Sequence, residues 1–507
     1  MALTMISKFF GFGREMVVAS LFGASAETDA WFLAVGVPLL LAGPVTAAIE
    51  RVFIPIFDDS IANNKAKSLL FRFSSLTLLI TFAVLIVPVW IFAPTVLKIM
   101  APGFDAQGIA LAAGMVRVAV FLTFFRVTAS IIRSVLHVNR NFIIPGLAGI
   151  PNNIIIMLFS FLFYRQWGIY ALVWATLIAS VFQLLYQLPC VLKSNLSGQL
   201  TAPSNNYLRE MLTLLPPVIL GSMSGQVKGI VDRMFASGLA EGSISFLNYA
   251  SLLKAMPSTL LIGTVATVVY PSLVTLNNSK NIAAFKRTLT QSLSTMVFLT
   301  IPIMVGMVIL AEPMVAFVYQ RGAFDAAAAQ GTSYAFRFFA LGLPGYAFFM
   351  LMNQAFYAIK DTKTPLVAML ISVLLNAFLN GLLIGSLQHG GLALATSISL
   401  TASGLYLLIK LQKRIGHLGL MGLRNEAAKA ITAGLGMALV CSFALTVAQR
   451  FFNPDTFVMK GLYVSILITL GALTYFALSW LLGSQGIKQS ADIVKRLTGR
   501  RVPPKAA

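Results

Sequence analysis

Residues Phe73–Leu97 read FSSLTLLITFAVLIVPVWIFAPTVL and contain no Asp, Glu, Lys or Arg. An α-helix needs about 20 mainly apolar residues to cross the hydrocarbon core of a bilayer, so this stretch is long enough to span a membrane. The uncharged stretch Thr364–Ile409 is long enough for two spans, which the turn Gln388–Gly391 separates. Similar uncharged windows are Phe142–Tyr164, Gln166–Leu192, Phe338–Ile359 and Gly461–Ile487. These stretches predict an all-α polytopic membrane protein.

The composition of the chain excludes an ordinary soluble protein. Of the 507 residues, 58% are hydrophobic and 10% are charged, whereas a soluble domain has about 25% charged and 45–50% apolar residues. The two cysteines, Cys190 and Cys441, lie in apolar runs, so neither a disulfide framework nor a Cys-x-x-Cys metal site is expected. With only three histidines in the chain, most histidine-based catalysis is also disfavoured.

Fourteen membrane spans account for the hydrophobic segments. The first of them contains the stretch Gly11–Glu15, which interrupts the apolar run, so we do not expect a cleaved signal peptide. The predicted spans lie near residues 3–22, 30–56, 73–96, 112–135, 142–164, 168–191, 211–237, 246–272, 289–311, 333–358, 365–386, 392–411, 428–450 and 461–482.

The distribution of basic residues predicts the orientation of the chain. With an even number of spans, both chain ends lie on the same side of the membrane. Of the 37 lysines and arginines, 23 fall in loops on that side, at the adjoining span ends or in the C-terminal tail, and five fall in the opposite loops or at their span ends. Because cytoplasmic loops carry the excess of Lys and Arg, both termini are expected in the cytoplasm. This asymmetry explains much of the net charge of +21, so no nucleic-acid partner is expected.

An internal repeat divides the chain into two copies. The segment Gly103-Phe104-Asp105 recurs in the second half of the chain as Ala323-Phe324-Asp325. Arg117 and Arg337, like Pro145 and Pro365, are separated by the same number of residues as Gly103 and Ala323. Two further matches, Gly168 with Gly390 and Phe53 with Val269, have slightly different separations. Spans 1–6 and 7–12 are therefore predicted to be two copies of one unit, with spans 13 and 14 appended.

The repeat predicts the architecture of the molecule. Because each copy has six spans, both copies enter the membrane in the same direction and are related by a pseudo-two-fold axis along the membrane normal. The expected parts are two six-helix lobes, residues 1–195 and 196–415, followed by residues 416–507 with two further helices and a basic tail. In transporters of this kind the substrate site lies between the lobes and opens alternately to each side. The alternative is that the six-span unit was duplicated in a protein that does not transport a substrate.

The first span contains a charged pair, Arg14 and Glu15, close to Gly11 and Gly13. A charge inside a span costs on the order of 3 kcal/mol or more and therefore usually faces a cavity or a partner. The two glycines predict a broken helix whose freed carbonyl groups lie in a wet cavity. A self-neutralising pair near the membrane interface is the alternative.

Basic side chains outnumber acidic ones within the spans. In span 4, Arg126 and Arg133 are seven residues apart and so lie on one helix face. Arginine matches a phosphate group bidentately, whereas an exporter of cationic drugs should show the opposite bias. A large anion such as a pyrophosphate is therefore the expected substrate. The basic residues are Arg14, Arg117, Arg126, Lys228, Arg233, Lys254 and Arg337, against Glu15 and Asp232.

A cation site is a second hypothesis. Asn376 and Asn380 are one turn apart in span 11, and Thr396 follows in span 12. With Asp232 of span 7, these residues offer oxygen ligands of the kind that sodium takes. Asp232 is also one turn from Lys228, so an ion pair between these two side chains is the alternative.

The chain resembles the MurJ/MviN family of lipid II flippases, within the multidrug/oligosaccharidyl-lipid/polysaccharide exporter superfamily. The resemblance covers nearly the whole chain and rests on the fourteen spans, the repeat and four motifs. These motifs are Gly11–Leu33, Phe53–Ile56, Val231–Ser237 and Phe356–Lys360.

The resemblance implies a two-lobe fold with a cationic central cavity and a groove toward spans 13 and 14 for a lipid tail. It also implies a flippase that moves a polyprenyl-diphosphate-linked saccharide from the inner to the outer leaflet of the bacterial inner membrane. The functional residues of the family match Arg14, Glu15 and Asp29, and its sodium ligands match Asp232, Asn376 and Thr396, with Asn380 where the family has an aspartate.

Two departures from the family pattern concern the substrate. The family has a cavity arginine in span 2, but Leu39–Ala48 contains none. In span 8, Ala250–Pro257 lacks the central arginine and both acids of the family. The expected substrate-binding residues are therefore Arg14, Glu15, Asp29, Arg126, Lys228, Arg233 and Lys254. Lipid II and an exopolysaccharide or O-antigen precursor both remain as substrates.

Other functions fit the sequence less well. The 16 acidic residues are scattered and no Gly-rich phosphate-binding loop occurs, so an enzyme is not expected. A cation-coupled multidrug exporter is the remaining alternative. No cofactor is expected apart from a coupling sodium ion. The expected partners are the lipid-linked saccharide and the membrane lipids, and the expected oligomeric state is a monomer.

Overall fold

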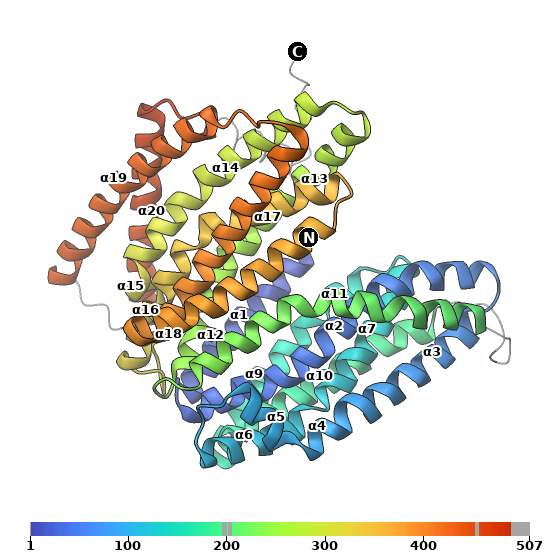
Figure 1. The fold of residues 1–507 in the computed structure, drawn as a ribbon. Helices are drawn as coiled ribbons and strands as arrows, with labels where there is room; N and C mark the ends of the chain where they lie inside the picture. The colour runs from blue at the N-terminus through green and yellow to red at the C-terminus, as the bar shows by residue number, and fades with distance from the viewer. Residues whose placement is uncertain (1, 195–199, 201–204, 452–455, 488–507) are drawn as a thin grey trace. The chain divides into compact units, whose positions relative to one another are not determined.

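The computed structural model describes residues 2–194, 200, 205–451 and 456–487, and the fold of this part is entirely helical (Figure 1). Helices suit these apolar segments because they satisfy every backbone N–H and C=O group without water. The α-helices are α1 (Ala2–Phe22), α2 (Ala26–Ala62), α3 (Ala66–Ile80), α4 (Val87–Ile91), α5 (Ala93–Met100), α6 (Ala106–Ala119), α7 (Leu122–Val138), α8 (Ile143–Leu147), α9 (Gly149–Trp167), α10 (Tyr170–Leu192), α11 (Asn205–Ala236), α12 (Ser243–Pro257), α13 (Gly263–Asn278), α14 (Ile282–Ile309), α15 (Ala311–Val318), α16 (Ala326–Leu341), α17 (Leu343–Ala358), α18 (Lys363–Ile415), α19 (Met421–Phe451) and α20 (Phe457–Leu481). Two π-helical turns, Thr81–Ile86 and Ser258–Ile262, interrupt this series.

Many of these helices are suited to a membrane. Ten stretches of helix in the described residues are long and apolar enough to span one, or eleven if the bent pair α16–α17 forms one span. The long α18 consists of two helical segments that meet at Gln388, where the backbone is not helical. The all-helical membrane fold is thereby confirmed, and the count of fourteen spans stays a prediction.

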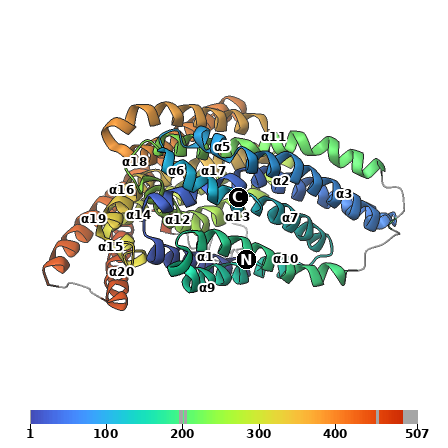
Figure 2. The same ribbon diagram turned by 90° about the horizontal axis from the view of Figure 1, so that it is seen from below.

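The chain folds into two compact units. The first comprises Met1–Ser245 and Arg321–Asp325, and the second comprises Phe246–Gln320 and Ala326–Ala507. The helix α11, which the repeat assigns to the second lobe, belongs to the first unit and packs along α2 (Figure 2). The division at residue 245 thus differs from the predicted boundary at 195, because sequence repeats record duplication whereas compact units record packing.

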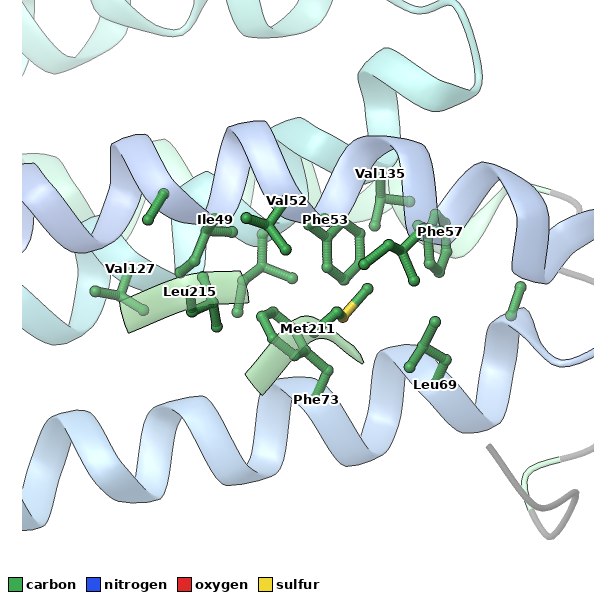
Figure 3. Packing of buried hydrophobic residues seen from close by; sticks show 14 of the residues in the cluster. Ile49, Val52, Phe53, Phe57, Leu69, Phe73, Val127, Val135, Met211 and Leu215 are labelled. Atoms are coloured by element: carbon green, nitrogen blue, oxygen red, sulfur yellow. The ribbon is translucent and has the colours of Figure 1, made fainter. Parts of the chain in front are cut away.

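The core of the first unit shows why α11 belongs there. Phe53 of α2 packs against Phe57 at 4.7 Å and against Phe73 of α3 at 5.1 Å between ring centroids. Met211 and Leu215 of α11 fill the same cluster (Figure 3). Full burial of such side chains stabilises the packed state by about 1.5–3 kcal/mol each in water-facing regions, and in lipid the close packing itself contributes.

The backbone confirms the internal repeat. Asn64 and Lys280 are both left-handed, each with φ 56°, and so are Arg140 and Lys360, with φ 57° and 61°. Each ends a helix in the same way, with the next N–H group donating to the carbonyl five residues earlier. The first pair keeps the sequence spacing of the Phe53–Val269 match, and the second keeps that of the Arg117–Arg337 match.

One repeat match needs a correction. Gly168 (φ 52°, ψ −139°) has the same backbone conformation as Gln388 (φ 48°, ψ −132°). The spacing of these two positions equals that of Arg117 and Arg337, so Gln388 is the structural equivalent of Gly168. The predicted match of Gly168 with Gly390 is therefore wrong, because neighbouring glycines obscured the register.

The first helix also differs from its prediction. α1 is continuous from Ala2 to Phe22 and is not broken at its two glycines. Gly11 faces Asn153 of α9, where a Cβ atom would lie 3.5 Å from the amide nitrogen. The glycine therefore allows close packing of α1 on α9 and does not interrupt the helix.

Candidate functional site

A polar cavity of about 290 Å³ lies inside the first unit, among α1, α2, α7, α9 and α10. Arg14 of α1 and Arg126 and Arg133 of α7 line it, and no Asp or Glu is among the described residues that line it. Uncharged polar lining comes from Thr46, Asn152, Thr176, Ser180 and Gln183. The cavity therefore combines positive charge with neutral hydrogen-bonding groups.

Two of the three arginines have acidic partners at the edge of the cavity. Arg14 forms an ion pair with Glu15, whose side chain is 6% exposed. Arg133 pairs with Glu50 of α2, with 2.9 Å between the guanidinium nitrogen and the carboxylate oxygen. These pairs fix the two guanidinium groups and balance their charges.

Arg126 is different, because no hydrogen bond or ion pair to a described residue holds its guanidinium group. The charged groups that act on it are Arg14 and Arg133, both of the same sign. A partly buried guanidinium group that lies near two other guanidinium groups and has no carboxylate partner of its own favours an anionic ligand. Substrate binding by Arg126 stays a prediction.

Asp29 has a different environment from the one expected of a substrate ligand. Its residue is 4% exposed, and its carboxylate accepts hydrogen bonds from the N–H groups of Gly242 (2.8 Å) and Ser245 (2.7 Å) and from the Ser245 hydroxyl (2.5 Å). These N–H groups begin α12, so Asp29 caps that helix and opposes the positive end of its dipole. The structure thus gives Asp29 a structural role, and substrate contact stays a prediction.

The charged residues of α11 interact within their own helix and with α2. The carboxylate of Asp232 attracts both Lys228 and Arg233, which agrees with the alternative that Asp232 serves as an ion-pair partner. The guanidinium group of Arg233 lies directly over Gly36 of α2, where a Cβ atom would collide with it. None of these three residues lines the arginine cavity.

The remaining predicted site residues belong to the second unit. The ammonium group of Lys254 in α12 lies 4.3 Å from the ring centroid of Phe339, a cation–π contact. Asn376 and Asn380 of α18 are both 0% exposed. The side-chain amide of Asn376 donates to the Thr396 hydroxyl at 3.3 Å, and the side-chain amide of Asn380 donates to Oδ1 of Asn376 at 3.5 Å.

Asn376, Asn380 and Thr396 lie together, as the sodium hypothesis requires, but they offer only neutral oxygen ligands. The fourth predicted ligand, Asp232, lies in the other compact unit. Within the described ranges, no group of three or more His, Cys, Asp or Glu side chains is placed to hold a metal ion. The neutral cluster fits a weakly held monovalent cation better than a divalent metal.

Sequence reasoning missed the uncharged wall of the cavity. Thr176, Ser180 and Gln183 are spaced four and three residues apart, so they share one face of α10. This spacing of polar residues in an apolar span was the signal that could have found them. The cap on α12 had no such signal, because Asp29 and Ser245 lie far apart along the chain.

Comparison with known proteins identifies the family. The model of the family described as "Lipid II flippase MurJ" matches residues 18–463. The probable lipid II flippase MurJ of Buchnera aphidicola subsp. Acyrthosiphon pisum is 30% identical, over 95% of this chain and 96% of the relative. The lipid II flippase MurJ of Burkholderia cenocepacia is 26% identical, over 95% of each chain.

Solved structures agree with this result. A structure entitled "Lipid II flippase MurJ, inward closed conformation" matches with a TM-score of 0.78 and 26% identity, over 95% of this chain and 97% of the other. An inward-facing multidrug resistance MATE family transporter matches with a TM-score of 0.69 and 14% identity, over 82% and 96%, and so shares the fold. The chain belongs to the MurJ family of lipid II flippases.

Proposed function

We propose that this protein moves lipid II, a polyprenyl-diphosphate-linked saccharide, from the inner to the outer leaflet of the bacterial inner membrane by alternating access. The family assignment supports the substrate. The observation that carries the proposal is the arginine cavity, in which Arg126 has only like-charged neighbours. A diphosphate group would relieve that repulsion.

The cavity provides for recognition of the diphosphate in two ways. Arg14 and Arg133 are held in place by Glu15 and Glu50, so they would meet the ligand without a large loss of side-chain freedom. Arg126 supplies the charge that its surroundings leave unbalanced, and its planar donors match phosphate oxygens. The amides of Asn152 and Gln183 line the same cavity and offer neutral donors and acceptors.

We also propose that the protein crosses the membrane fourteen times as a monomer, with both termini in the cytoplasm. The two segments of α18 on either side of Gln388 would each form one span. The helices α1 and α11 would complete the set despite their charged residues, because Arg14 pairs with Glu15 and Asp232 attracts Lys228 and Arg233. The excess of basic residues in the proposed cytoplasmic loops supports this orientation.

Sodium coupling is proposed for the cluster of Asn376, Asn380 and Thr396, with Asp232 as the charged ligand. The hydrogen-bonded amide and hydroxyl groups of the cluster support the proposal. Transport should slow when sodium is replaced by potassium in proteoliposomes held at constant membrane potential. An unchanged rate would exclude a role for sodium.

Rescue of a bacterium depleted of its own lipid II flippase tests the main function. We expect the wild-type protein to restore lipid II exposure at the outer leaflet. Arg14→Ala should abolish the rescue, because it removes a cavity charge and leaves the buried Glu15 without its partner. Arg14→Lys keeps the charge and should retain part of the activity.

Arg117→Ala is the matched control. Arg117 lies 6.0 Å from the Trp90 ring centroid and does not line the cavity, so its loss should leave exposure unchanged. Membrane abundance is measured for every variant. No exposure with the wild-type protein, at confirmed abundance, would reject lipid II and favour an exopolysaccharide or O-antigen precursor.

A further inference from the structure

A second pocket, of about 620 Å³, lies in the second unit and is lined by residues of α15, α16 and the bend of α18. It is separate from the arginine cavity and from the asparagine cluster. Its lining is mostly polar and includes Gln330, Ser333, Tyr334, Arg337, Gln388 and His389. With both termini in the cytoplasm, as proposed above, this pocket faces the outer side of the membrane.

Gln388 occupies a backbone conformation that glycine adopts far more easily. Its φ of 48° and ψ of −132° match those of Gly168 at the equivalent turn of the first copy. A side chain at such an angle strains the backbone, and strain of this kind concentrates at functional sites. The chain has glycines at 390 and 391 but a glutamine at the strained position, and this glutamine is one of the residues that line the pocket.

The aromatic wall of the pocket is also specific to the second copy. In the first copy the hydroxyl of Tyr170 lies against Gly114, where a Cβ atom would collide with it. At the equivalent positions of the second copy the large and the small residue are exchanged: Tyr334 stands at the position of the glycine and Gly390 at that of the tyrosine. The ring of Tyr334 lies against Gly390. The exchange moves the tyrosine from the second helix of the pair to the first and places it in the pocket lining.

His389 holds this wall in place. Its Nε2 atom lies 2.9 Å from the carbonyl oxygen of Gly331, and its ring centroid lies 5.4 Å from that of Tyr334 in an edge-on contact. The residue is 8% exposed, so it serves to position its neighbours. The ring of Tyr334 is therefore held against His389, next to the exposed Gln388.

The charges at the rim are only loosely paired. The closest approach of Arg337 and Glu312 is 3.9 Å, and their side chains are 44% and 58% exposed. The equivalent arginine of the first copy, Arg117, faces Trp90 instead. A loose exposed pair is easily rearranged, so it leaves room for hydrogen bonds to a polar ligand.

The chemistry of this lining matches a saccharide. Sugar hydroxyl and N-acyl groups both donate and accept hydrogen bonds, as do the side chains of glutamine, serine and tyrosine. The flat face of an aromatic ring covers the C–H face of a pyranose. A lining with one aromatic ring, several neutral amides and hydroxyls and a balanced charge pair suits a neutral, amide-bearing sugar better than a free phosphate or a lipid tail.

We propose that this pocket is a saccharide-binding subsite, in which Gln388 and Gln330 hydrogen-bond to hydroxyl or N-acyl groups and Tyr334 stacks on the sugar ring. The identity of the glycan rests on the proposed function: the bound group is the saccharide headgroup of the lipid after it reaches the outer side. Gln388 is thus a specificity residue that the first copy of the repeat lacks.

Binding of a soluble sugar to the purified full-length protein tests the proposal. The probe is N,N′-diacetylchitobiose, with cellobiose as the matched sugar without N-acyl groups, and the readout is saturation-transfer NMR and calorimetry in detergent. We expect the wild-type protein to bind the acetylated sugar in preference to cellobiose. Gln388→Gly should bind it about tenfold more weakly, the effect of one or two lost hydrogen bonds.

The glycine variant is informative because it relieves strain, so it should not unfold more easily than the wild type. Gly168→Gln places the same residue at the equivalent turn of the first copy and should leave sugar affinity unchanged. Tyr334→Leu is a second variant that should also weaken binding. The proposal is overturned if the wild type binds no acetylated sugar, or if Gln388→Gly binds it as tightly as the wild type.

The outcome is separable from that of the rescue experiment. Rescue of lipid II exposure by a wild-type protein that binds no acetylated sugar would reject the subsite and keep the proposed function. Sugar binding that depends on Gln388, without rescue, would support the subsite and assign the protein to a different lipid-linked glycan.

Discussion

The two copies of the repeat use equivalent positions for opposite chemistry. In the first copy α7 carries Arg126 and Arg133 into a cavity, and at the equivalent positions of the second copy α17 carries Tyr346 and Asn353. Asn353 bonds to a carbonyl of its own helix. Thr176 lines the arginine cavity, whereas its equivalent Thr396 joins the neutral asparagine cluster. The backbone is thus shared, while the charge at these two positions is confined to the first copy, so we expect the two copies to divide the tasks.

The largest expected effect comes from replacing Arg126 of the first copy with tyrosine, the residue at the equivalent position, Tyr346, of the second copy. Arg126→Tyr should lower lipid II exposure by about 10- to 100-fold, because charge-assisted hydrogen bonds contribute about 1.5–3 kcal/mol each. Folding should be preserved, since Arg126 faces only like charges. Tyr346→Phe, the matched change in the second copy, should have little effect. Equal losses in both variants would contradict the division of tasks.

A second comparison concerns how the second helix of each copy begins. Ser25 caps α2 from within its own chain segment, whereas α12 is capped by Asp29 from α2. Asp29→Ala should destabilise the purified protein by about 2 kcal/mol, because two N–H groups lose a charged acceptor. Thermal unfolding in detergent measures this loss. Ser25→Ala should cost less, about 1 kcal/mol, and the reverse order would show that the carboxylate cap is not important for stability.

The equivalent turns at Gly168 and Gln388 allow a reciprocal exchange. Gln388→Gly should stabilise the protein by about 1 kcal/mol, and Gly168→Gln should destabilise it by a similar amount, because only glycine takes this conformation without strain. No atom lies within 4 Å of a Cβ built on Gly168, so a clash does not complicate the result. Unfolding midpoints of the two variants that shift in the same direction would contradict a backbone origin.

The smallest effect is expected at two equivalent loops, which contain Asn141 in the first copy and Asp361 in the second. Burial raises the pKa of Asp361, but hydrogen bonds from Thr364 and Lys363 and the charge of Arg414 outweigh it, so the pKa lies below its ordinary value of 3.8. The lowered pKa adds stability above about pH 4 that is lost as the pH falls. At the equivalent position in the first copy, Asn141 accepts a backbone N–H at 3.4 Å without this dependence.

Asp361→Asn should therefore remove at most about 1 kcal/mol at neutral pH, because Arg414 is 54% exposed and its pair is screened by solvent. The difference from the wild type should shrink as the pH approaches 3. Unfolding curves measured from pH 3 to pH 7 test this trend, and a difference that stays constant would mean that the charge of Asp361 does not matter.

The predictions from sequence succeeded where one local pattern decides the structure. Uncharged stretches such as Phe73–Leu97 can bury their backbone polar groups only as helices, and the matched turns at Arg140 and Lys360 follow from the repeat. The spacing of Arg126 and Arg133 placed both on one helix face, and the cavity contains both. The broken first helix was wrong, because Gly11 is used for close packing on Asn153.

The sequence by itself determined the membrane class, the duplication and the excess of intramembrane arginine, because these depend on composition and spacing along the chain. Only the tertiary structure decided which charges are balanced. It paired Arg133 with the distant Glu50, left Arg126 facing like charges, and used Asp29 to cap α12. Such partners depend on how distant helices pack, and no local pattern carries that information.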